Sequence, residues 1–131
     1  LELGGLCDAA EEGHARRSLD RARMGPVPTR ADLEALGFFV CEADLEDELI
    51  RAAGSAAVEA VLHEQGELGS FRRFQDQPAQ RERGVHAQLR RFLGTRARRK
   101  IRYGTLLVEA IALSRMPRPL VLVVEHTLSR A

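Results

Sequence analysis

Two segments of this sequence place acidic residues directly after a short apolar run. Residues 1–7 end in Cys7 and continue into Asp8, with Glu11 and Glu12 about one helical turn later. Residues 38–41 end in Cys41, and five acids follow between positions 42 and 48: Glu42, Asp44, Glu46, Asp47 and Glu48. Carboxylates crowded together repel each other unless they are protonated or neutralised by a cation. The two segments are therefore the first place to look for a bound cation.

Whether these acids act together depends on the elements that carry them. Residues 1–7 and 38–41 are short apolar runs joined through helical patterns, which favours strands of one parallel sheet. Ligands of such sheets gather beyond the carboxyl ends of the strands. If the two strands are parallel neighbours, both acidic clusters lie at the same edge. Their oxygen ligands would suit Mg²⁺ or Mn²⁺.

A second explanation of the acids needs no ligand. The helix dipole stabilises acidic residues in the first turn of a helix by roughly 0.3–1 kcal/mol each. For the acids farther from the strand ends, helix stabilisation and a functional role are equally good explanations: Glu11, Glu12, Asp47 and Glu48. Metal binding is the stronger interpretation for the acids nearest the strand ends: Asp8, Asp44 and Glu46.

The rest of the chain reads as mostly helical. Thr29 followed by Asp32 resembles a capping box that opens a short helix, and Gly37 is expected to end it. Further helices are expected over residues 9–24, from the acidic run to Gly54, over 56–65 with Ser55 as the N-cap, around Phe71 and Phe74, over 80–93, and from Thr95 onward. The last of these is expected to carry Ile101, Leu106, Leu107, Ile111 and Leu113. The valine run after Met116 resembles a strand, but Pro117 or Pro119 suits a first helical turn, and we expect a helix.

Charge is distributed unevenly. Residues 1–65 carry 6 basic and 14 acidic side chains, whereas residues 66–131 carry 14 basic and 5 acidic ones. Seven basic residues gather between positions 90 and 102: Arg90, Arg91, Arg96, Arg98, Arg99, Lys100 and Arg102. Such a cluster predicts contact with a nucleic-acid backbone, because basic side chains neutralise phosphates and release counterions. The alternatives are a solvated helix face, or pairing with the acidic half.

Composition limits the class of protein. The chain has 131 residues, 44% of them apolar and 30% charged, which is typical of one globular domain. No apolar run approaches the length of a membrane span, and no signal peptide is visible, so we expect a cytoplasmic protein. Cys7 and Cys41 are expected to be reduced and buried. The four histidines show no zinc-binding spacing.

The segments LCDAAEE, GFFVCEADLEDELI and RARRKIRYGTLLVEAI, in this order, resemble the Toprim domain of the overcoming-lysogenization-defect (OLD) nucleases and its stand-alone bacterial relatives. The resemblance runs from about Leu6 to Leu113 and is most specific at Asp44-Leu45-Glu46. It implies a Rossmann-like α/β Toprim fold, with a small parallel sheet flanked by helices and a mostly helical C-terminal half. The activity it implies is magnesium- or manganese-dependent cleavage of nucleic-acid phosphodiesters.

The resemblance also assigns residues. Asp8 matches the first aspartate of the Asp-x-Asp motif, and Glu11 or Glu12 would replace the second, which falls at Ala10. Asp44 and Glu46 match the Asp-Leu-Glu element that completes the metal site. The implied metal ligands are therefore Asp8, Glu11, Asp44 and Glu46. Lys100, the only lysine, matches a lysine near the scissile phosphate, so Lys100 and Glu46 are the implied catalytic residues.

The family's opening strand and its glutamate have no counterpart and would precede Leu1. We therefore expect a Toprim domain truncated at its N-terminus, with an acidic α/β part over residues 1–54 and a helical basic part over 55–131. The alternative functions are a non-catalytic nucleic-acid-binding fragment and a protein-interaction fragment. The expected partners are nucleic acid, with DNA backbone contacts foremost, and either a second copy of the chain or a separate ATPase. No membrane partner is expected.

Overall fold

The computed structural model describes residues 4–22 and 26–129 of the chain. These residues form two compact units. The strand unit comprises Leu1–Leu45 and Pro117–Ala131, and the helical unit comprises Glu46–Met116. The C-terminal segment thus belongs with the N-terminal strands, although most of the sequence separates them.

A two-stranded parallel sheet is the centre of the strand unit. Strand β1 (Gly5–Asp8) pairs with β2 (Phe38–Cys41), and the register sets Gly5 opposite Phe38 and Asp8 opposite Cys41. The predicted parallel pairing is therefore confirmed. The sheet is small, but its second strand is well buried, with Phe39, Val40 and Cys41 each 6% exposed or less.

The connection between the strands is helical. A 3₁₀ turn η1 (Ala9–Glu11) leads into α1 (Glu12–Arg21), and α2 (Arg30–Ala35) follows. Thr29 and Asp32 form the predicted capping box, which satisfies backbone N–H groups at the start of α2. Leu33 of α2 is fully buried in a small core with Val27 and Val40.

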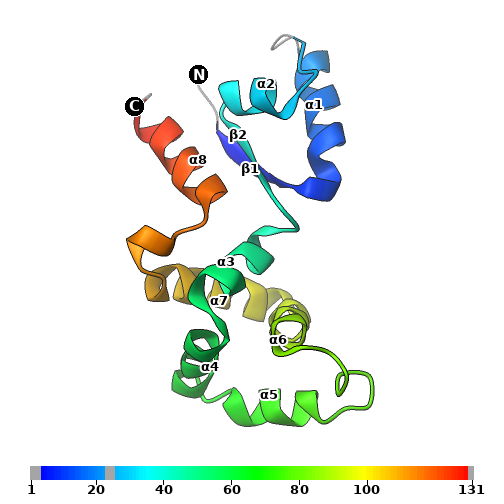
Figure 1. The fold of residues 1–131 in the computed structure, drawn as a ribbon, viewed down its shortest axis with the longest axis vertical. Helices are drawn as coiled ribbons and strands as arrows, with labels where there is room; N and C mark the ends of the chain where they lie inside the picture. Colours follow the sequence, from blue (N-terminus) through cyan, green and yellow to red (C-terminus); the bar gives the residue numbers. More distant parts are fainter. Residues whose placement is uncertain (1–3, 23–25, 130–131) are drawn as a thin grey trace. The chain divides into compact units, whose positions relative to one another are not determined.

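The C-terminal helix α8 (Arg118–Ser129) packs against both strands, and Pro119 is buried in its first turn. Figure 1 shows the strands between α8 on one side and α1 on the other. The ring of His126 lies edge-on to Phe39, with centroids 6.4 Å apart, and covers Gly37. Gly37 has φ +92°, and a Cβ there would collide with the His126 ring. Two independent requirements, the left-handed backbone and the close approach, therefore demand glycine at this position.

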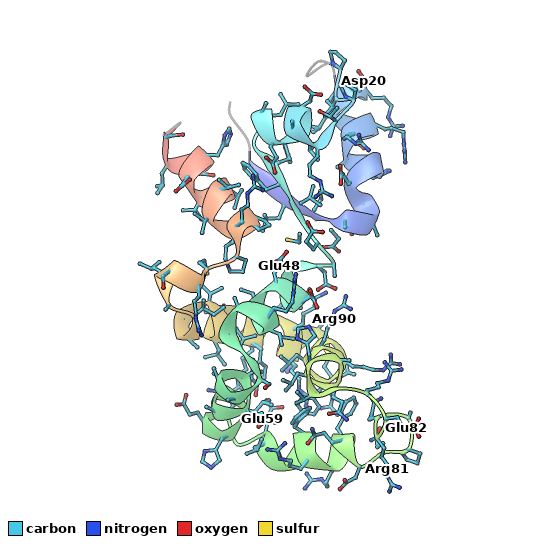
Figure 2. All side chains as sticks on the ribbon, in the orientation of Figure 1. Asp20, Glu48, Glu59, Arg81, Glu82 and Arg90 are labelled. Carbon is cyan, nitrogen blue, oxygen red and sulfur yellow. The ribbon has the colours of Figure 1, made fainter. Side chains whose placement is uncertain are left out.

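The helical unit contains α3 (Leu45–Ala53), α4 (Ser55–Glu64), α5 (Leu68–Gln75), α6 (Val85–Gly94), α7 (Ala97–Ala110) and the 3₁₀ turn η2 (Leu113–Arg115). An aromatic cluster of Phe71, Phe74 and Phe92 joins α5 to α6, with ring centroids 5.3–6.5 Å apart. Tyr103 is 1% exposed, and Leu62 and Leu89 are fully buried. At the surface, Arg72 pairs with Glu59 (labelled in Figure 2) at 2.9 Å.

Three local predictions for this unit were wrong. The helix expected from residue 80 begins at Val85, because residues 76–84 form turns tied to α6 by the buried Gln88, whose amide donates to Gln80 O at 2.7 Å. Gly54, with φ +84°, is the N-cap of α4 in place of Ser55. The helix expected to carry Ile111 and Leu113 ends at Ala110, and Leu113 lies in η2. The buried side of α7 consists of Tyr103 and Leu107, whereas Ile101 is 75% exposed.

The chain is thus an α/β protein with a small parallel sheet flanked by helices, as predicted. Every helix within residues 4–22 and 26–129 is too short or too polar to cross a lipid bilayer.

Candidate functional site

The acidic edge of the strand unit is where β1 and β2 end. Asp8 is the last residue of β1 and pairs in register with Cys41, so Glu42 leaves β2 at the same edge. Asp8 and Asp44 are half-buried, whereas Glu11 and Glu42 are exposed. The parallel sheet therefore brings the first acids of both segments to one edge, which the sequence patterns predicted.

A guanidinium group joins the two acidic segments. Arg30, the first residue of α2, places Nη2 2.6 Å and Nε 3.0 Å from Oε1 of Glu12. Its Nη1 lies 3.4 Å from Oε1 of Glu42. Hydrogen bonding to Arg30 lowers the pKa of Glu12 below its ordinary value, and the same bond raises the pKa of Arg30. Part of the charge at this edge is therefore neutralised from within the protein.

Sequence reasoning missed Arg30 because it lies 18 residues from Glu12 and 12 from Glu42. One signal could have found it. The Thr29 capping box fixes where α2 begins, and a helix between two parallel strands must return the chain to the start of the second strand. A basic residue in the first turn of that helix is unfavourable for the helix dipole, and a nearby acidic partner offsets this effect.

The predicted metal ligands do not assemble a metal centre in the part of the chain that is described. Within residues 4–22 and 26–129, no three His, Cys, Asp or Glu side chains come together in a way that could hold an ion. Asp8, Glu11 and Asp44 belong to the strand unit, and Glu46 belongs to the helical unit. Mg²⁺ and Mn²⁺ take several oxygen ligands, so the described residues do not by themselves form a complete site for either ion.

The two predicted catalytic residues lie together in the helical unit. Lys100 of α7 places Nζ 3.1 Å from Oε1 of Glu46 in α3, with the lysine side chain 53% exposed. The two charges neutralise each other. The structure thus brings together the two residues that the resemblance implies to be catalytic, and it places them in an ion pair with each other.

The remaining acids of α3 also have basic neighbours. Asp47 Oδ1 lies 2.7 Å from Nε2 of His86 in α6, and Asp47 Oδ2 lies 2.9 Å from Nε of Arg51. Glu48 lies 3.5 Å from Arg51. These contacts give the acidic run after β2 a structural explanation, because they secure α3 within the helical unit.

The basic cluster divides into two groups. In the first, Arg99 donates to Glu67 at 3.0 Å and stacks on Phe92, with its Cζ 4.0 Å from the ring centroid. Arg102 lies 3.9 Å from the same Glu67, and the Tyr103 hydroxyl donates to it at 3.1 Å. Burial and then the hydrogen bond to Glu67 raise the pKa of Tyr103 well above its ordinary value. This group stabilises the fold.

The second group consists of Arg91, Arg96 and Arg98. All three side chains are exposed, and none has an acidic partner among the described residues. Arg90, labelled in Figure 2, is exposed on α6 as well. Of the two alternatives to nucleic-acid contact, pairing with the acidic half is observed for Lys100 with Glu46. Arg99 and Arg102 pair with Glu67 of their own half, and among the described residues the second group pairs with neither half.

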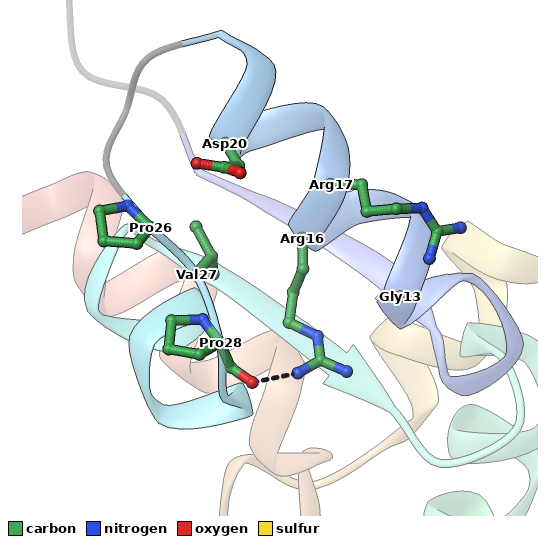
Figure 3. Close-up of a pocket in the computed structure, with 7 residues that line it drawn as sticks. All are labelled: Gly13, Arg16, Arg17, Asp20, Pro26, Val27 and Pro28. Carbon is green, nitrogen blue, oxygen red and sulfur yellow. Dashed lines mark hydrogen bonds between the residues drawn. The ribbon is translucent and has the colours of Figure 1, made fainter.

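A hollow of about 360 Å³ lies beside α1 in the strand unit (Figure 3). Arg16 crosses it and donates from Nη1 to Pro28 O at 2.6 Å, which ties the loop before α2 to α1. Arg17 and Asp20 lie on its rim with opposite charges. Arg16 therefore has a structural role in this hollow, because it holds the loop before α2 against α1.

Comparison of the chain with protein-family models, with curated proteins and with solved structures finds no match. Its function therefore has to be inferred from the geometry of the chain itself.

Proposed function

We propose that this chain binds the phosphate backbone of nucleic acid through the helical unit and does so without catalysis. The observation that carries the proposal is the group of exposed arginines Arg91, Arg96 and Arg98, which have no acidic partner among residues 4–22 and 26–129. An arginine left without an internal partner keeps its charge available for phosphate, to which its planar fork binds in a bidentate manner.

The electrostatics of the unit support this choice. The sequence of Glu46–Met116 holds 13 basic and 9 acidic residues, a net charge of +4. Phe71 and Phe92 are 0% and 4% exposed and Phe74 is half-buried, so the aromatic cluster offers at most one ring and no extended platform on which successive bases could stack. Contact with the backbone is therefore favoured over readout of the bases.

Fluorescence anisotropy with labelled single-stranded and duplex DNA, in EDTA, tests the proposal. We expect binding that weakens steeply between about 50 and 200 mM salt, because counterions are released when phosphates are neutralised. Replacing Arg91, Arg96 and Arg98 together by alanine should lower the salt slope for single strands by about 2, at about 0.7 per phosphate lost. Wild-type protein that does not bind at low salt would refute the proposal.

A metal-dependent nuclease of Toprim type is the second candidate, and one observation favours it. The parallel pairing of β1 and β2 brings Asp8 and the acids after Cys41 to the same edge, where ligands of parallel sheets gather. Calorimetric titration of Mn²⁺ into wild-type protein and Asp44→Ala tests this candidate. Saturable binding that the substitution abolishes would support it, and absence of binding in both proteins would refute it.

A further inference from the structure

A second hollow lies in the helical unit, between α5 and the junction of α6 with α7. Its volume is about 460 Å³, within the range of pockets that hold small ligands. Eight residues line it: Ser70, Arg73, Phe74, Gln77, Phe92, Thr95, Arg96 and Arg99. Three of the eight are arginines and none is acidic. We refer to it as the arginine pocket.

Two of its arginines are exposed and one is held in place. Arg99 is only 14% exposed, and its Nη1 donates to Phe92 O and to Thr95 Oγ1, each at 3.2 Å. Glu67, behind the pocket, neutralises Arg99 at 3.0 Å. Arg73 and Arg96 are exposed and have no acidic partner among the described residues. The pocket therefore presents the positive charges of Arg73 and Arg96, neither of which is paired with an acid among the described residues. The hydrogen bonds of Arg99 hold the adjoining segment from Phe92 to Thr95 in place.

The polar groups of the wall complete an anion site. Ser70 Oγ accepts from Arg73 Nη2 at 3.2 Å, so its own hydroxyl proton can be donated to a ligand. Gln77 adds an amide with two N–H donors. Beside these donors lies the half-buried ring of Phe74, an apolar surface next to a cationic one. A ligand that fits must combine an anionic group with a flat or apolar part.

We propose that the arginine pocket binds a nucleotide, with the phosphate between Arg73 and Arg96 and the remainder against Phe74. This inference rests on the proposed function and names the place where a phosphate group is held individually. A terminal phosphate offers three acceptor oxygens to the two guanidinium groups, whereas a carboxylate offers two. The nucleotide is either a free molecule or a unit of a single strand, and the experiment separates these two sources.

The test compares three proteins: wild type, Arg73→Ala/Arg96→Ala, and the control Arg21→Ala/Arg115→Ala. The control removes the same charge from two exposed arginines outside the pocket. Adenosine monophosphate, adenosine and inorganic phosphate are titrated by calorimetry. A labelled single strand of about 12 nucleotides, a length within the range of known single-strand sites, is titrated by anisotropy. Circular dichroism establishes that all three proteins are folded.

We expect wild type and control to bind adenosine monophosphate more tightly than inorganic phosphate, and adenosine to bind weakest. The pocket variant should lose at least about tenfold in affinity for the monophosphate, because two charge-assisted hydrogen bonds are removed. Because Arg96 also belongs to the proposed backbone group, the source of the nucleotide is determined by competition on wild-type protein. Displacement of the labelled strand by adenosine monophosphate would identify a strand as a source, and monophosphate binding without displacement would identify the free molecule.

Two results would overturn the inference. One is wild-type protein that does not bind the monophosphate, and the other is a pocket variant that binds every probe as the control does. In either case, oligonucleotide binding by wild-type protein would leave the proposed backbone contact through Arg91 and Arg98 intact. Failure of wild type to bind the oligonucleotide would instead refute the proposed function.

Discussion

The strand unit and the helical unit are stabilised in different ways. The strand unit, whose sequence carries 7 basic and 10 acidic residues, has a small aliphatic core, and ion pairs tie its elements together. Arg30 joins Glu12 to Glu42, and Arg118 of α8 pairs with Glu34 of α2 at 2.9 Å. The helical unit, with 13 basic and 9 acidic residues, is built on a cluster of phenylalanines and a buried tyrosine.

This difference sets the pH response of each unit. Hydrogen bonds from arginine lower the pKa of Glu12 and of Glu34. A carboxyl whose pKa is lower in the folded state stabilises the protein above the unfolded value and loses that effect as pH falls through the folded value. Burial raises the pKa of Tyr103, so its stabilising effect is complete below about pH 10 and is lost as pH rises further. Acid should therefore weaken the strand unit first, and alkali the helical unit.

The largest expected effect is on the aromatic core. Phe71→Ala should lower the free energy of unfolding of the helical unit by about 3–5 kcal/mol, because it leaves a cavity at a fully buried position. Tyr103 is the only tyrosine and there is no tryptophan, so intrinsic fluorescence during urea unfolding reports on this unit alone. Ile101→Ala, at a position 75% exposed, is the control and should change stability by less than about 0.5 kcal/mol.

The next largest effect is expected in the strand unit. Gly37→Ala should destabilise it by about 1–3 kcal/mol, because alanine is strained at φ +92° and its Cβ would displace His126. Amide exchange should become faster in β2 and α8 and stay unchanged in α4 to α6. Gly84→Ala is a matched control, since Gly84 has φ −64° and open space around it. Equal exchange rates in the two variants would contradict the packing of α8 on the sheet.

Tyr103→Phe should reduce the loss of stability that wild-type protein shows at alkaline pH. We expect a loss of about 1 kcal/mol at neutral pH from the hydrogen bond to Glu67. Above about pH 10 the variant should lose stability less steeply than wild type, because it has no phenol to ionise in the unfolded state. Chemical unfolding followed by circular dichroism across this range is the measurement. A wild-type curve that parallels the variant would show that Tyr103 does not govern alkaline stability.

The smallest effect is expected from Arg30→Ala. Its ion pairs are partly solvated, with the arginine side chain 43% exposed, so the loss at neutral pH should be below about 1 kcal/mol. The variant should also lose less stability than wild type when the pH falls from about 5 to 3, since Glu12 no longer gains from its charged form. The control Arg17→Ala, on the exposed face of α1, should lose as much stability as wild type over the same pH range. If Arg30→Ala loses as much stability as wild type over this pH range, Arg30 does not join the two acidic segments energetically.

Much of the strand unit was predictable because its determinants are local. The apolar runs before Cys7 and Cys41, the Thr29 capping box and the glycine after α2 each act within a few residues. Their helical connection favoured parallel pairing, and the acidic edge followed from it. The arginine pocket was not predictable, since Ser70, Arg73 and Arg96 converge only when α5 packs against α6 and α7.

The sequence by itself determined where charge and apolar residues concentrate, and hence most helices, both strands and the common edge of the acids. Only the tertiary structure decided which charges are neutralised. Arg30 reaches Glu12 and Glu42, Lys100 reaches Glu46, and Glu67 holds Arg99, whereas Arg91, Arg96 and Arg98 keep exposed charges. The physical reason is that charge pairing requires approach within a few ångströms, and this distance is set by how helices pack rather than by separation along the chain.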